Sequence, residues 1–283
     1  MRSSNPVMNS LTTSAANQSQ TNRDAGAQYA GYGAAAKAHY DMNPVDYGQA
    51  AGYERPITVD DVVAKTGITL AVIIALAIVS FGISAFVNPG LGALLTLVGG
   101  IGGFITVLVA SFGKKWGSPV VTLVYAAFEG LFVGGFSFLF TGATVGGASA
   151  ASLIGQAVLG TVGVFIGMLF VYKVGAVRVT PRFTKMLFGA LLGVVVLMIG
   201  NLLLALFTGM SPLRDGGMLA IVFSLVCIGL GALSFLTDFD QADRLIRAGA
   251  PSKAAWGVAL GLAVTLVWLY TEILRLLSYF QNK

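Results

Sequence analysis

Charged residues are scarce in this chain of 283 residues. Asp, Glu, Lys and Arg make up 10% of it, whereas soluble globular proteins carry about 25%. A soluble fold of this size would not cover its surface with so few charges. Composition therefore excludes a soluble enzyme, a disordered protein and a soluble nucleic-acid-binding protein, and we expect no nucleic-acid partner.

Cysteine and histidine are each present once. Cys227 lies in an apolar run and has no partner for an internal disulfide, while His39 lies outside every long apolar run. A His/Cys site for a transition metal and a catalytic histidine inside a membrane are both excluded. No phosphate-binding loop, GxSxG or HExxH motif occurs either. We therefore expect no cofactor and no enzymatic activity.

Apolar residues, by contrast, make up 56% of the chain, and the mean hydropathy is +0.82. A membrane-spanning helix needs about 20 apolar residues, because it crosses roughly 30 Å of hydrocarbon at 1.5 Å per residue. Seven runs meet this length: 67–87, 91–112, 119–141, 152–173, 184–208, 217–238 and 256–279. The chain is predicted to be an all-α, polytopic membrane protein, with a disordered tail over 1–60 and a seven-span membrane domain over 61–283.

The distribution of basic residues predicts the orientation. Of the 17 Lys and Arg residues, 14 lie in the tail and in the loops on its side of the membrane, and 3 lie on the other side. Because basic residues accumulate on the cytoplasmic side, we expect the N-terminus in the cytoplasm and the C-terminus outside. This bias also explains the basic pI of 9.4 without nucleic acid.

Glycine is abundant, with 37 residues, and many glycines in the spans are four positions apart. Such pairs let helix backbones approach closely in a membrane. We interpret them as packing positions within one compact bundle, and the pairs are Gly99/Gly103, Gly130/Gly134, Gly163/Gly167, Gly189/Gly193 and Gly257/Gly261.

Two carboxylates fall well inside the predicted spans, Glu129 in the third and Glu272 in the seventh. A charge at the bilayer centre costs at least ~2.5 kcal/mol, so these side chains are expected to face the bundle interior or a water-filled cavity. Arg275 follows Glu272 by three residues and either pairs with it on one helix face or extends to the outer membrane surface.

Two further acids, Asp238 and Asp240, directly follow the sixth apolar run. They point about 200° apart on a helix, so only one of them is expected to face the interior. Neighbouring carboxylates share protons and suit either a pH-sensitive gate or a site for a hard cation such as Ca²⁺. The pattern leaves open which of the two aspartates faces inward.

Three segments together resemble the transmembrane Bax inhibitor motif family: residues 125–131 (YAAFEGL), Phe239-Asp240 and residues 268–277 (WLYTEILRLL). The opening residues 2–7 (RSSNPV) look like its bacterial, actinobacterial-type branch. The resemblance covers roughly residues 60–283. It implies a helical bundle whose last helix is central, and a pH-sensitive calcium leak gated by an acidic pair from the last two helices.

The resemblance implies that Glu272 corresponds to the family's acidic residue in the last helix, and that Asp240 or Asp238 corresponds to the acidic residue in the sixth helix. Glu129 corresponds to the glutamate of the family's Glu-Gly-Leu motif in the third helix. Calcium is then expected at Asp240, Glu272 and Glu129. This chain has Glu where the family has Asp in the last helix, and the stretch between residues 240 and 272 is longer than the family pattern. Depth along the spans places Asp240 at the cytoplasmic rim and Glu272 deeper, which makes Glu129 the nearer partner expected for Glu272.

The leading hypothesis is a pH-sensitive calcium or proton leak channel of the bacterial plasma membrane. The alternative is a regulator that binds a membrane-anchored protease, or a stress-response membrane protein without transport activity, with the N-terminal tail as its contact. A coupled transporter would require internal repeats, and none is evident.

Overall fold

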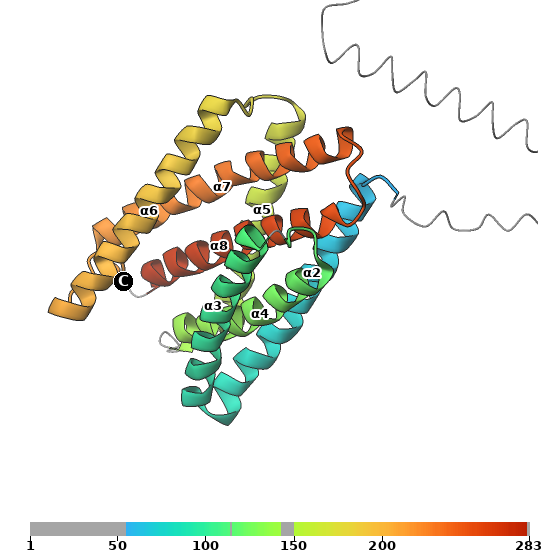
Figure 1. The fold of residues 1–283 in the computed structure, drawn as a ribbon. Helices are drawn as coiled ribbons and strands as arrows, with labels where there is room; N and C mark the ends of the chain where they lie inside the picture. Colours follow the sequence, from blue (N-terminus) through green and yellow to red (C-terminus); the bar gives the residue numbers. More distant parts are fainter. Residues whose placement is uncertain (1–54, 114, 143–149, 282–283) are drawn as a thin grey trace, which may run out of the picture. The chain divides into compact units, whose positions relative to one another are not determined.

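The computed structural model describes residues 55–113, 115–142 and 150–281, and these form seven long helices. Most of the predicted tail, up to residue 54, lies outside the described residues. Figure 1 shows the helices in chain order. They are α2 (Val59–Gly82, continued by the π-helical turn η1, Ile83–Val87), α3 (Pro89–Phe112), α4 (Pro119–Gly142), α5 (Ala150–Lys173), α6 (Pro181–Thr208), α7 (Met218–Arg247) and α8 (Ala254–Gln281).

All seven helices are long and apolar enough to cross a membrane. The described residues contain no strand, and their single β-bridge joins Pro56 to Pro251. These seven helices confirm the prediction of an all-α, seven-span membrane bundle. Helices suit this environment because each one satisfies its backbone polar groups within a single segment in lipid.

Local chemistry determines where several helices begin and end. Thr58 and Asp61 form a capping box at the start of α2. The Asn88 side chain accepts hydrogen bonds from two backbone amides at the start of α3, and Pro89 occupies the first helical position. Gly209 ends α6 at φ +74°, a conformation that favours glycine.

The helix α7 extends nine residues beyond the predicted end at 238. Two ion pairs between residues four apart accompany this extension, Asp240 with Arg244 and Asp243 with Arg247. Such pairs stabilise a helix that leaves the hydrocarbon and enters the charged interface.

The start of α2 lies beside the turn between α7 and α8. The Ile57 amide donates to the Ala250 carbonyl at 2.8 Å, and the Ser252 amide donates to the Arg55 carbonyl at 2.9 Å. Ile57 is buried, so order begins before residue 60, the predicted end of the tail. The segment before the first span and the loop after the sixth therefore lie at the same end of the bundle, as the distribution of basic residues requires.

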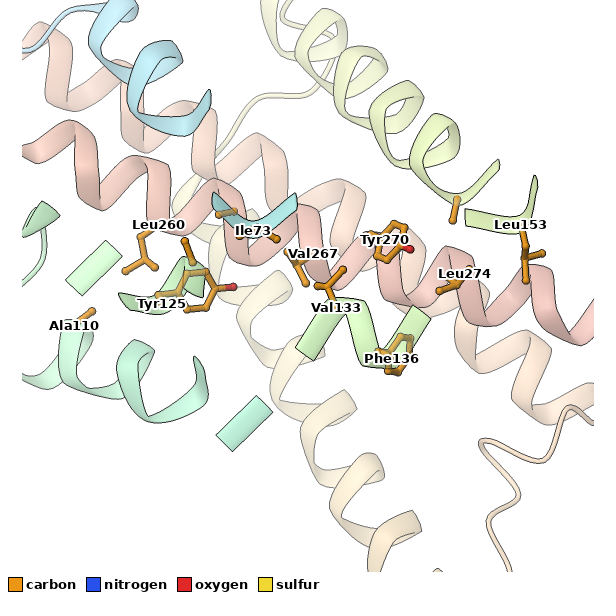
Figure 2. Close-up of a cluster of buried hydrophobic side chains, with 13 residues drawn as sticks. Ile73, Ala110, Tyr125, Val133, Phe136, Leu153, Leu260, Val267, Tyr270 and Leu274 are labelled. Atoms are coloured by element: carbon orange, nitrogen blue, oxygen red, sulfur yellow. The ribbon is translucent and has the colours of Figure 1, made fainter. Parts of the chain in front are cut away.

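The last helix, α8, is the central one. It packs against α2, α4, α5 and α7, whereas α6 packs mainly against α7. In its most apolar stretch, 72% of the residues of α8 are buried, compared with 11% in α6. Figure 2 shows the main apolar cluster, in which residues of α4 such as Val133 and Phe136 lie with Val267 and Leu274 of α8. The predicted central position of the last helix is confirmed.

Candidate functional site

Polar groups occur at successive levels along the central helix α8. Thr265 lies nearest its N-terminal end, Tyr270 and Thr271 follow, and Glu272 and Arg275 lie toward its C-terminal end; all five are buried. Burial of polar groups in a membrane bundle is costly unless they are paired, so their partners indicate what the site does.

Glu272 and Arg275 form a buried ion pair on one face of α8. The Nη1 of Arg275 donates to the Oε1 of Glu272 at 2.8 Å. The Arg275 side chain is 4% exposed and the Glu272 side chain 2%. The guanidinium also lies 5.7 Å from the ring centre of Phe136 and 5.9 Å from that of Phe140, both on α4. Of the two positions expected for Arg275, the structure has the pairing with Glu272 rather than extension to the membrane surface.

This ion pair is incompletely satisfied. Among the described residues, the second carboxylate oxygen of Glu272 (Oε2) and the Nε of Arg275 have no hydrogen-bond partner. The buried hydroxyls of Tyr279 and Ser224 also have no hydrogen-bond partner among these residues. Leaving buried polar atoms unpaired costs about 1–3 kcal/mol each, so these atoms are the ones in the site that could still bind water or an ion.

Of the two aspartates near the end of α7, Asp238 contacts the central helix. The Thr265 hydroxyl donates to the Asp238 carboxylate at 2.8 Å. Asp240 instead pairs with Arg244 of its own helix at 2.7 Å. The question that the sequence left open is thereby answered: Asp238 faces α8.

Glu129 borders a cavity of about 400 Å³ between α3, α4 and α8. The Tyr125 side chain, one turn earlier on α4, borders the same cavity and interacts with this carboxylate. A Cβ added to Gly103 of α3 would lie 2.8 Å from the Glu129 Oε2, so the absent side chain leaves room beside the carboxylate. The expectation that Glu129 faces a cavity rather than lipid agrees with this geometry.

The predicted acids occupy separate places and do not form one cluster. In the described part of the chain, no group of three or more acidic, His or Cys side chains is close enough to hold a metal ion. Asp238 contacts Thr265, which precedes Glu272 by seven residues or about 10 Å of helix. The expected joint calcium site of Asp240, Glu272 and Glu129 is therefore not assembled in this conformation.

Sequence reasoning missed three polar partners. Thr265, Ser137 and Tyr270 carry no charge, so a search for ionisable residues in spans did not find them. Ser137 of α4 and Tyr270 of α8 share a buried hydrogen bond of 2.8 Å between their hydroxyls. Their signal in the sequence is weak, because Ser, Thr and Tyr are common in membrane helices as interhelical hydrogen-bonding groups.

The fold and these sites define a seven-span membrane bundle with paired and partly paired acids around a central last helix. The Bax inhibitor 1 like family model matches residues 5–282, and the chain belongs to this family. The family resemblance seen in the sequence is thereby confirmed, but the match extends beyond the expected residues 60–283 and includes most of the predicted tail. A comparison with curated proteins finds no match.

Proposed function

We propose that the protein is a pH-dependent cation leak of the membrane, which passes Ca²⁺ or protons down their gradients under the control of Glu272, Glu129 and Asp238. The buried ion pair of Glu272 and Arg275 on the central helix carries the proposal. Membrane proteins keep charges at such positions mainly along ion pathways and proton relays.

The Arg275 guanidinium occupies the position that a permeating cation would take beside Glu272. One carboxylate oxygen is paired with it and the other has no partner within the described residues. In this closed arrangement the guanidinium neutralises the acid. Release of Arg275 from this pair would free the position for a cation, and a pathway controlled by carboxylates is expected to conduct in a pH-dependent way.

The other two acids support a pathway rather than a single binding site. Glu129 borders a cavity that also contacts Thr271, the residue before Glu272, while Asp238 bonds to Thr265 nearer the opposite end of α8. Oxygen ligands from α4, α7 and α8 thus lie at several depths beside the central helix α8. This arrangement allows a cation to move between weak sites.

Flux in proteoliposomes tests the proposal, with a calcium indicator and a pH indicator used separately. Replacing Glu272 and Arg275 together by Gln removes both charges and leaves no unpaired charge in the bundle. We expect this double variant to lose the pH dependence of flux, and Glu129→Gln to reduce flux by about tenfold, the effect of ~1.4 kcal/mol on a barrier.

Asp243→Asn is the matched control, because Asp243 pairs with Arg247 at the exposed end of α7. It should leave flux and its pH dependence unchanged. Flux that is identical in the wild type, in Glu129→Gln and in the double variant would show that these carboxylates do not control permeation.

A further inference from the structure

We propose that the cavity beside Glu129 binds an organic cation, a protonated or quaternary alkylamine that reaches it from the lipid. The proposal goes beyond the leak function and does not depend on it. Four aromatic side chains and one carboxylate line this cavity: Phe104, Tyr125, Phe132, Trp268 and Glu129. Its volume of about 400 Å³ is within the range of small-molecule sites.

The carboxylate provides the charge that selects a cation. No Lys or Arg lines the cavity, and within the described residues Glu129 has no ion pair, unlike Asp61, Asp240, Asp243 and Glu272. The side chain that interacts with it is the neutral Tyr125. A cationic ligand would supply the missing counter-charge.

The walls favour an organic cation over a metal ion. Ca²⁺ takes six to eight oxygen ligands, and this cavity offers one carboxylate. The Thr271 hydroxyl already donates to the Trp268 carbonyl at 2.8 Å. Aromatic faces attract cations with a weak hydration shell, and recognition of quaternary ammonium groups by aromatic residues is the common case.

The position of the cavity indicates that the ligand carries an alkyl chain. Glu129 is the eleventh of the 24 residues of α4 and therefore lies near the middle of a span. Phe104 borders the cavity and is 65% exposed on the surface of α3, which also exposes Leu97 and Ile101 to the surroundings. Entry from the side requires a molecule that partitions into the bilayer with its charged head reaching Glu129.

Gly103 keeps space open for the head group. It lines the cavity, and a methyl group at this position would meet the Glu129 Oε2 at 2.8 Å. Gly163 on α5 has no atom within 4 Å of an added Cβ. The two glycines therefore form a matched pair, of which only Gly103 faces the proposed ligand.

Binding of radiolabelled hexyltrimethylammonium to the full chain in lipid nanodiscs tests the proposal, with empty nanodiscs subtracted. This probe is charged at every pH. Its uncharged analogue, in which carbon replaces nitrogen, should compete at least about tenfold more weakly, since a desolvated cation–π contact and an ion pair each contribute on that scale. Equal competition by the two compounds would overturn the proposal.

Glu129→Gln and Trp268→Leu should each weaken binding by about tenfold or more, while Trp268→Phe, which keeps a ring, should retain most of it. Asp243→Asn should bind as the wild type does.

If Glu129→Gln fails to fold, Gly103→Ala tests the site instead. This variant should lose binding of the probe, while Gly163→Ala should retain it. Unchanged binding in both Gly103→Ala and Glu129→Gln contradicts the site. Binding is measured without an ion gradient, so its failure leaves the leak proposal untouched.

Discussion

At the scale of single residues, the pair of Glu272 and Arg275 is costly to bury, because both charges lose their contact with water. Both side chains are removed from solvent, and each still has an unpaired polar atom among the described residues. Removing one partner of a buried ion pair is more damaging than removing both, because the remaining charge loses its compensation.

The variant Arg275→Met tests this energetic asymmetry. It should destabilise the protein by ~3–5 kcal/mol, whereas replacing Glu272 by Leu as well should recover much of the loss. The midpoint of denaturation in detergent measures the effect. Arg244→Met is the control, because the Arg244 side chain is 68% exposed and its pair with Asp240 contributes ~1 kcal/mol or less. If Arg275→Met lowered the stability by no more than Arg244→Met does, the buried pair would stabilise the protein no more than an exposed pair.

At the scale of elements, glycine decides how closely α2 and α4 approach each other. A Cβ at Gly130 would lie 2.7 Å from the Ile73 carbonyl oxygen, and one at Gly134 would overlap the Ala77 carbonyl oxygen. The interpretation of Gly130/Gly134 as packing positions agrees with these contacts. Gly163, Gly167, Gly189 and Gly193 have no atom within 4 Å of an added Cβ, so close packing within the described bundle does not require them.

Substitution of these glycines by alanine should separate the two groups. Gly134→Ala is expected to cost ~1–3 kcal/mol, since a carbonyl of the neighbouring helix cannot yield as a flexible side chain does. Gly189→Ala should be neutral or slightly stabilising, because alanine favours the helix by about 1 kcal/mol. Thermal denaturation of both variants in the same detergent compares them, and equal midpoints would refute the packing role of Gly134.

At the scale of the whole molecule, the orientation in the membrane stays a prediction from the basic residues. The native Cys227 is buried, so it can be replaced by Ala and single cysteines placed at exposed sites. A membrane-impermeant maleimide added to intact cells should label cysteine at Asp215, in the turn before α7, and not at Lys253, before α8. Labelling at 253 but not at 215 would reverse the proposed orientation.

Binding of a membrane-anchored protease through the N-terminal tail also stays a prediction, because residues 1–54 lie outside the described part of the chain. Co-purification with the full chain and with a chain lacking residues 1–54 checks it. Loss of a protease partner together with the tail, at unchanged flux, would support the regulator alternative alongside the leak.

Composition and apolar run length determined the fold class and the seven spans, because a hydrocarbon layer admits few architectures and a 20-residue apolar run signals a span without tertiary information. The family was indicated by three sequence segments, residues 125–131, 239–240 and 268–277. The sequence also located Glu129, Glu272, Asp238 and Asp240, since ionisable groups stand out in apolar helices and at their ends. The tertiary structure alone decided their partners. Whether Arg275 turned inward, whether Asp238 or Asp240 faced α8, and which glycines touched a neighbour depended on the rotation and packing of helices around α8, and those contacts join residues far apart in the sequence.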